Sequence, residues 1–327
     1  MDVSLVTSLY RAASFLAAFS THITRVIPVV QAAGITIELI IVANDATDEE
    51  RAIIDQLPAT LGTAVVRPVY VPRETLYASW NRGIEAAQGQ AISFWNVDDV
   101  RTPEGIIACW HAIQGGCELV YPGWVVAQDH RWLGLFDVPH RYTHTPQPYD
   151  RDAFYQRLEI GPFFMFAPSL YQSAGAFDPR FRIAGDFEWS LRAIEQTKPC
   201  GVDVIGGTFY RHGENLSSRA AVTLEYNISL LLNNTSDKLV PAPPHEMREL
   251  WSQWADDVAI SDDNATYLWG DGAAARWDAY QQQQAQKQRS FQRNDLLRMV
   301  PRLLIDRLGL RPLLYRLGVV KSPHRRT

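Results

Sequence analysis

The sequence predicts an α/β fold with a mostly parallel, doubly wound sheet and a C-terminal helical extension. Between residues 3 and 99, apolar β-type runs alternate with helical segments of roughly 10 to 20 residues. The run IELIIVAND is continuously apolar, as in a strand buried on both faces of a parallel sheet. Small polar or acidic residues follow the predicted strands, and such sheets bind ligands beyond the carboxyl ends of their strands.

Each element follows from its own pattern. Strands are expected at residues 3–9, 37–45, 64–71 and 91–99, where apolar and β-branched residues are concentrated. Helices are expected at residues 12–33, 48–57 and 74–89, and Gly89 is a typical C-terminal stop. Residues 121–166 are rich in proline and aromatic residues, which predicts loops and short strands. A helix is expected to begin near Asp186, and residues 206–219 predict a strand that runs into a polar loop.

Three regions are predicted: an α/β domain at 1–218, a helical extension at 219–284 and a basic tail at 285–327. The tail has 11 Lys and Arg against 2 acidic residues, whereas the remainder has 20 basic and 34 acidic residues. Its leucine clusters alternate with single arginines, which favours a position in the headgroup region of an anionic membrane. Packing on the acidic body or on a second subunit would satisfy the same pattern.

The overall composition, 46% hydrophobic and 20% charged, is that of an ordinary globular protein. Cys109, Cys117 and Cys200 form no CxxC pair, so their spacing indicates neither a zinc site nor a disulfide framework. The start MDVSLVTSLY lacks the features of a signal peptide, and no run reaches the roughly 18 apolar residues of a membrane span. We therefore expect a cytoplasmic protein, peripheral on the inner face of the membrane if its tail binds there.

Other ligand classes lose support. No GxGxxG follows the first strand and no GxxxxGKS or GxxxxGKT occurs, which argues against dinucleotide and P-loop sites. The acidic body and the lack of a recognisable binding module argue against nucleic acid as a partner.

Asp98 and Asp99 end the apolar run ISFWN and have two interpretations. With Thr102, Pro103 and Glu104 they are suitable types for a helix N-terminus. Alternatively, Asp98 binds Mg²⁺ or Mn²⁺, because these ions are commonly held by one or two carboxylates together with phosphate. The two interpretations are compatible.

The order of these motifs resembles that of the inverting family 2 glycosyltransferases, which have the Rossmann-like GT-A fold. The resemblance covers about residues 3–218. It is carried by five stretches, in chain order: residues 7–10 (TSLY), 44–48 (NDATD), 80–84 with Gly89 (WNRGI), 95–99 (WNVDD), and 175–178 with 185–192 (GAFD and GDFEWSLR).

The resemblance implies a role for several residues. Asp186 would be the general base that takes the proton of the acceptor hydroxyl, with Glu188 and Trp189 on the acceptor side. The helix N-cap for Asp186 and a helical ion pair between Glu188 and Arg192 are the structural alternatives. Asp98 and His212 would bind the metal. The donor nucleotide sugar would contact six residues: Ser8, Asn44, Asp45, Arg73, Asn96 and Asp98.

The sequence also departs from the family pattern. Asn96 replaces the first acid of the usual DxD, which puts metal binding on Asp98. Gly185 stands where a Glu is common, and Trp80 where an Arg is common. No QxxRW is present, which argues against processive synthesis of a polysaccharide chain.

The predicted function is therefore non-processive, metal-assisted hexosyl transfer, as in polysaccharide biosynthesis. The donor would be a nucleotide sugar, with UDP the commonest nucleotide, and the acceptor a glycan or lipid-linked glycan. The alternatives are a nucleotidyltransferase and a GT-A-fold glycan-binding or membrane scaffold protein without activity. The residues VSLVTSLYRAAS lack the glycine-rich loop expected of the former, whereas Asn96 gives the latter some support.

Overall fold

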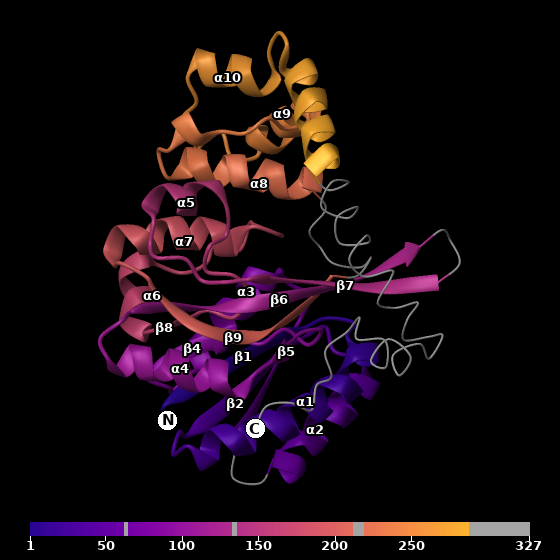
Figure 1. The fold of residues 1–327 in the computed structure, drawn as a ribbon, viewed down its shortest axis with the longest axis vertical. Coiled ribbons are helices and arrows are strands. Elements are labelled where there is room, and N and C mark those ends of the chain that lie inside the picture. Colours follow the sequence, from indigo (N-terminus) through magenta and orange to yellow (C-terminus); the bar gives the residue numbers. More distant parts are fainter. Residues whose placement is uncertain (62–64, 133–135, 212–218, 288–327) are drawn as a thin grey trace, which may run out of the picture. The chain divides into compact units, whose positions relative to one another are not determined.

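The computed structural model describes residues 1–61, 65–132, 136–211 and 219–287. The larger part of the chain forms a mixed sheet covered by helices (Figure 1). The strand order is β3-β2-β1-β4-β8-β6-β9-β5, with β7 paired to β6. The first four strands are β1 (Val3–Leu9), β2 (Ile37–Asn44), β3 (Val65–Val71) and β4 (Ala91–Phe94). They pair in parallel, as predicted, so their carboxyl ends lie at one edge.

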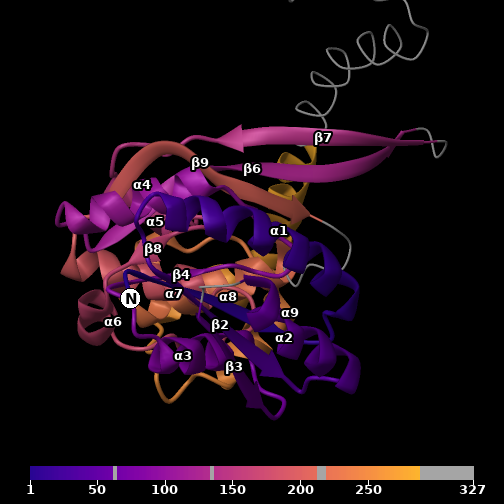
Figure 2. The ribbon, with the colours of Figure 1, turned by 90° about the horizontal axis from the view of Figure 1, so that it is seen from below.

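The other strands add antiparallel pairs. β8 (Met165–Phe166) joins β4 to β6 (Leu119–Trp132), and it is antiparallel to both. β9 (Cys200–Arg211) runs parallel to β6, whereas β5 (Val100–Arg101) is antiparallel to β9. β7 (Phe136–His144) pairs with β6 as a hairpin that extends beyond the rest of the sheet (Figures 1 and 2). The sequence predicted loops and short strands here because prolines interrupt the alternating pattern.

Helices cover both faces of the sheet. α1 (Ala13–Ala32), α2 (Asp48–Leu61) and α4 (Pro103–Gln114) share one apolar core with alternate residues of β1 and β2. α3 (Leu76–Ala86) lies on the other face, where Gly83 permits close approach: an added Cβ would be 2.3 Å from Val6 Cγ1. α7 (Gly185–Gln196) packs on this same face through Trp189, with α5 (Arg151–Gln156) and α6 (Pro168–Ala174) beside it.

α1 is the helix, among the described residues, that is long and apolar enough to cross a membrane by length and composition. The sequence was predicted to contain no run of that length, so α1 departs from the prediction by length and composition. The buried positions of α1, among them Leu16, Phe19, Ile23 and Ile27, recur at helical spacing and face the core. This pattern is typical of a helix packed on a sheet.

The chain forms two compact units. One comprises residues 1–240 and 249–261, and it includes α8 (Arg219–Leu232) and η1 (Ser236–Lys238). Among the described residues, the other comprises 241–248 and 262–287, with α10 (Asp262–Trp269) and a helical stretch at 273–287. α9 (Pro244–Ser252) contributes residues to both. The predicted basic tail lies outside the described residues, apart from residues 285–287.

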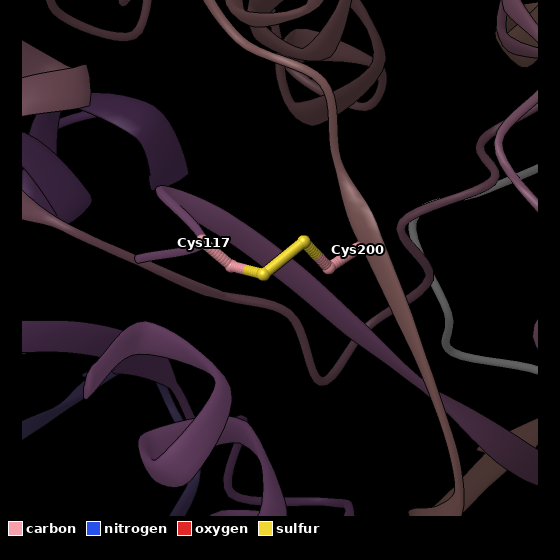
Figure 3. Close-up of a disulfide and its surroundings, with 2 residues drawn as sticks. All are labelled: Cys117 and Cys200. Carbon is pink, nitrogen blue, oxygen red and sulfur yellow. A yellow bond between two sulfur atoms is a disulfide. The ribbon is translucent and has the colours of Figure 1, made fainter. Parts of the chain in front are cut away.

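A disulfide joins Cys117 to Cys200, with Cα atoms 6.2 Å apart (Figure 3). The prediction that no disulfide framework is present was therefore wrong. Cys200 begins β9 and pairs in register with Val120 of β6, so parallel pairing brings together two cysteines that are 83 residues apart. Sequence spacing cannot reveal a pair that only strand pairing creates. Cys109 is a buried free thiol.

Candidate active site

The predicted donor-binding residues lie at the carboxyl edge of the parallel strands. Ser8 is the penultimate residue of β1, Asp45 follows β2, and Asn96 follows β4. The backbone N–H of Trp95 still donates to the carbonyl of Val6, so the chain after β4 remains beside β1 up to that point. The edge therefore gathers these groups from separate parts of the sequence.

Asn44 fastens this edge to α3. Its side-chain amide donates to the Glu74 carbonyl at 2.8 Å, and its Oδ1 accepts the Glu74 N–H at 3.1 Å. It also donates to Ser79 Oγ at 3.2 Å. Asn44 is 3% exposed, so its amide is engaged in holding the β3–α3 loop, which carries Arg73.

Asp45 is exposed and adopts the left-handed conformation at φ 50°, which Asp tolerates better than most residues. Glu50, in the first turn of α2, holds the adjacent loops. Its carboxylate accepts the N–H of Thr47 at 2.8 Å and that of Ala12, before α1, at 2.5 Å. Glu50 was not among the predicted site residues, although Thr47-x-x-Glu50 has the spacing of a capping box.

Arg73 lies over an aromatic ring at the same edge. Its guanidinium carbon is 3.3 Å from the centroid of the Tyr10 ring, and that of Arg11 is 5.2 Å from it. Arg73 and Arg11 are exposed. Two cations beside the strand ends make this part of the edge suited to an anionic ligand such as a diphosphate.

The two acids in the loop after β4, Asp98 and Asp99, differ in their burial. Asp99 is 1% exposed and accepts Asn96 Nδ2 at 3.1 Å and the Tyr210 N–H at 3.2 Å. Burial, reinforced by the neighbouring Asp98, raises the pKa of Asp99 to about 8. Asp98 is half-buried.

Neither acid caps the next helix. The N-cap of α4 is Thr102, whose Oγ1 accepts the Gly105 N–H at 3.1 Å, with Pro103 in the first turn. The capping interpretation of Asp98 and Asp99 was therefore wrong. The cap is Thr102, followed by Pro103, both of which the sequence indicated as suitable types, so neither acid is used for that purpose.

The described residues contain no group of three His, Cys, Asp or Glu side chains that could hold a metal ion. His212, the predicted second ligand, lies outside the described residues. The carboxylate of Asp98 is a suitable ligand for Mg²⁺ or Mn²⁺. These ions can be held by one carboxylate with substrate phosphate, and Asp98 is a half-buried carboxylate at the ligand-binding edge.

Asp186 lies in the first turn of α7, beside the same edge. Its Oδ1 accepts the Phe187 N–H at 2.9 Å and lies 3.2 Å from the hydroxyl of Tyr77, which is in the first turn of α3. The N-cap of α7 is Ala184 rather than Asp186. Burial raises the pKa of Asp186 to about 6, against the opposing effect of these hydrogen bonds.

The Tyr77 ring explains one departure from the family pattern. A Cβ on Gly185 would lie 2.7 Å from Tyr77 Cδ2, so the ring occupies the space that a side chain at position 185 would need. Tyr77 is 1% exposed and donates to the Ile183 carbonyl at 2.8 Å. Its contact with residues 183–186 has no signal in the sequence, because the partners are about a hundred positions apart.

The connection from Asp186 to the strand edge can be followed through contacts. Tyr77 belongs to α3, whose N-cap Thr75 donates its hydroxyl to the Pro179 carbonyl at 2.7 Å. The preceding residue, Glu74, is bound by Asn44 at the end of β2. Asp186, in the first turn of α7, and Asp98, after β4, thus lie at the same edge of the sheet.

The two predicted acceptor-side residues are engaged in internal contacts. Glu188 is 4% exposed and pairs with Arg192 at 2.7 Å, one helical turn further on. Trp189 is fully buried, and its Nε1 donates to the Gly175 carbonyl at 3.0 Å. Its ring stacks on Phe177 with centroids 4.9 Å apart. Trp189 also contacts Phe166 of β8, with ring centroids 5.1 Å apart, and this contact anchors α7 on the sheet.

Comparison with known structures supports the fold. The S. aureus protein TarS, residues 1–349 in complex with UDP-GlcNAc, matches with a TM-score of 0.56 and 10% identity, covering 79% of this chain and 72% of that one. A mannosyltransferase from Pyrobaculum calidifontis, in complex with GDP-Man and Mn²⁺, matches with a TM-score of 0.51 and 12% identity, covering 85% and 73%. At such identities the likeness concerns the fold alone. No curated protein matches the sequence.

Residues 4–172 match the family described as glycosyl transferase family 2. The match includes Asp98 and ends before Asp186. It spans more than half of the 327 residues. The protein therefore belongs to glycosyl transferase family 2 and is a glycosyltransferase with the GT-A fold.

Proposed function

We propose that the protein is an inverting glycosyltransferase that moves one sugar from a nucleotide diphosphate sugar to a hydroxyl of a glycan or lipid-linked glycan. The observation that carries the proposal is the environment of Asp186. This carboxyl lies beside the ligand-binding edge of a GT-A fold, and burial raises its pKa to about 6. A carboxylate with such a pKa is ionised at neutral pH and is a stronger base than an exposed aspartate.

In the proposed mechanism, Asp186 accepts the proton of the acceptor hydroxyl as its oxygen attacks the anomeric carbon. The nucleotide diphosphate departs from the opposite face of the sugar, so the configuration at that carbon is inverted. Ser8, Asp45 and Arg73 would hold the nucleotide, since they lie at or just beyond the ends of β1, β2 and β3. Asn44 and Asn96 would act through the loops that they fasten.

Asp98 would hold Mg²⁺ or Mn²⁺ together with the donor diphosphate, with His212 as the second protein ligand. When bound, the ion would neutralise charge that develops on the departing diphosphate. The mannosyltransferase of similar fold is in complex with Mn²⁺ and GDP-Man, which supports this part of the proposal by analogy. UDP and GDP sugars are the donors to test first, because both occur in the structural relatives.

The acceptor side is proposed to lie next to Asp186. Glu188 and Trp189 would not contact the acceptor directly, because their side chains are buried, and would instead hold α7 in position. We further propose a cytoplasmic location, with the basic tail on the inner face of the membrane. A membrane-bound position would bring the site close to lipid-linked acceptors.

The experiment is a screen of UDP and GDP sugars for hydrolysis and transfer, with Mn²⁺ and with EDTA. We expect one donor to turn over only with the metal, and the product to have the inverted anomeric configuration. Asp186→Asn should lower kcat by about 10³-fold or more, and the nucleotide affinity should change little. Asp98→Asn should instead weaken donor binding in the presence of Mn²⁺.

Three outcomes would contradict the proposal. A product with retained configuration would exclude the direct displacement. An Asp186→Asn variant that keeps its activity would remove the base. Donor binding without any turnover across the screen would favour the inactive glycan-binding alternative.

A further inference from the structure

Glu225 of α8 holds the backbone that leads into Asp186. Its Oε1 accepts the Arg182 N–H at 3.0 Å, and its Oε2 accepts those of Ile183 at 2.9 Å and Ala184 at 2.7 Å. Glu225 is 9% exposed. One carboxylate thus receives three consecutive backbone donors, which is a strong, charge-assisted arrangement. Neither the family match nor the resemblance assigns a role to this residue.

The three N–H groups belong to residues 182–184, the segment directly before the first residue of α7. The N-cap residue Ala184 has no side-chain cap hydrogen bond, and Glu225 accepts its backbone N–H, one of the four donors at the start of α7 that have no partner within the helix. A negative charge is also favourable at a helix N-terminus. A second link, between the stacked rings of Phe187 and Tyr226 at 3.9 Å, fixes α7 against α8. The direction in which Asp186 projects therefore depends on α8.

We propose that Glu225 is a positioning residue for catalysis, which fixes the backbone of residues 182–184 so that the Asp186 carboxylate meets the acceptor hydroxyl. The inference rests on the proposed function of Asp186 as general base. Geometric demands on a base are severe, since a misplacement of about 1 Å can cost on the order of 100-fold in rate.

Glu225 also acts on Asp186 through its charge. The groups that face Asp186 are Tyr77 of α3, and Tyr226 and Glu225 of α8. The Glu225 carboxylate raises the pKa of Asp186, whereas the Tyr77 hydrogen bond lowers it. Removing the charge of Glu225 should therefore lower the pKa of Asp186, and removing the Tyr77 hydroxyl should raise it.

The test compares two substitutions that separate length from charge. Glu225→Gln keeps the length of the side chain and removes its negative charge. Glu225→Asp keeps the charge, but its shorter side chain moves the carboxylate away from the three backbone N–H donors. We expect both to lower kcat by ~10-fold or more, with less than a twofold change in the donor KM. The acid limb of the pH–rate profile should move to lower pH in Glu225→Gln and stay in place in Glu225→Asp.

Glu38→Gln is the matched control. Glu38 is also a buried glutamate that accepts a backbone donor, the Gln88 N–H, and two side-chain donors, Ser4 Oγ and Arg67 Nε, but it lies on β2 near the opposite edge of the sheet. We expect Glu38→Gln to lower thermal stability and to leave both kcat and the acid limb unchanged. Unchanged kcat in both Glu225 variants would overturn the inference, and so would an equal loss in Glu38→Gln.

A titration that needs no turnover separates this inference from the proposed function. The Asp186 carboxyl carbon can be followed by NMR in ¹³C-labelled protein, with its signal assigned by loss in Asp186→Asn. We expect its apparent pKa to fall in Glu225→Gln and not in Glu38→Gln. If Asp186→Asn keeps full activity while this shift is seen, the proposed base is wrong and the coupling stands. If the shift is absent and kcat is unchanged, the inference fails, whatever the role of Asp186.

Discussion

The hydroxyl oxygen of Tyr77 lies 3.2 Å from Asp186 Oδ1 and 2.8 Å from the carbonyl oxygen of Ile183. One O–H group thus serves the proposed base and the backbone just before it. This contact joins α3, which starts at the ligand-binding edge of the sheet, to α7, which carries Asp186. It makes the proton affinity of Asp186 depend on a residue far away in the sequence.

Tyr77→Phe should make Asp186 a weaker acid. The hydrogen bond from Tyr77 lowers the pKa of Asp186 in the native protein, so its loss should raise that pKa above about 6. The acid limb of the kcat/KM profile should then move to higher pH, with a loss of stability of about 1 kcal/mol. The pH–rate profiles of both proteins check this. An acid limb at the same pH in both would show that the hydroxyl does not act on the base.

Asp186→Asn should stabilise the protein at neutral pH while it removes activity. The folded-state pKa of Asp186, about 6, lies above the ordinary value of 3.8, so the folded state binds more protons between these values. Stability is therefore lost as pH rises from about 4 to 6, and the ionised carboxylate costs on the order of 3 kcal/mol at pH 7. Urea unfolding of both proteins at pH 7.5 and pH 4 should show this gain at the higher pH alone. Equal stabilities at pH 7.5 would contradict the raised pKa.

Gly185→Ala should damage the site through Tyr77. The added Cβ would lie 2.7 Å from the Tyr77 ring, which is itself buried and cannot retreat easily. We expect a loss of about 1 to 3 kcal/mol in stability, with a marked fall in kcat. Gly115→Ala is a suitable control, because φ is −75° there and an added Cβ would come no closer than 3.3 Å to a neighbour. If Gly185→Ala is as active and stable as Gly115→Ala, the Tyr77 ring is free to move away from the added methyl group.

Reduction of the Cys117–Cys200 bond should lower stability. The bond spans 83 positions, and a loop of that length corresponds to about 4.5 kcal/mol in the chain-entropy model, an upper value. Oxidised protein should lose about 2 to 4 kcal/mol on treatment with dithiothreitol, as measured by urea unfolding. The double variant Cys117→Ser, Cys200→Ser should be insensitive to the reductant. Cys109→Ser keeps the bond and should respond as the wild type does.

Removal of residues 290–327 should release the protein from membranes if the basic tail binds anionic lipid. Sedimentation with vesicles that contain or lack phosphatidylserine would measure this for the full chain and the truncated chain. Donor hydrolysis should be unchanged, since the site lies within residues 1–240. Equal sedimentation of both chains would contradict a membrane role and favour contact with the body or a second subunit.

Some of the site could be predicted because its residues follow strands of known direction. The apolar runs at 3–9, 37–45 and 91–99 predict parallel strands, and parallel strands place their carboxyl ends together. Ser8, Asp45 and Asp98 could therefore be placed at one edge of the sheet. Local residue spacing also predicted that a helix begins near Asp186. In the structure this helix, α7, begins at Gly185.

Other contacts could not be predicted, because each joins groups that are distant in the sequence. Asn81 is an example. Its amide bonds the backbone of Phe177 in both directions and accepts the Tyr171 hydroxyl at 2.9 Å. Asn81 and its partners are about 90 or more positions apart, and the sequence does not reveal that they are in contact. The same holds for the bond from Cys117 to Cys200 and for the burial of Trp95 and Trp189.

By itself, the sequence determined the parallel sheet, the chain segments that follow its strands, and the kinds of side chain available there, because periodicity and strand direction are local properties. Only the tertiary structure decided that Asp99 turns inward and that Tyr77 and Glu225 hold the segment around Asp186. The reason is physical. Burial and hydrogen bonding are set by whatever neighbours the fold supplies, and at Asp186 those neighbours come from two other helices.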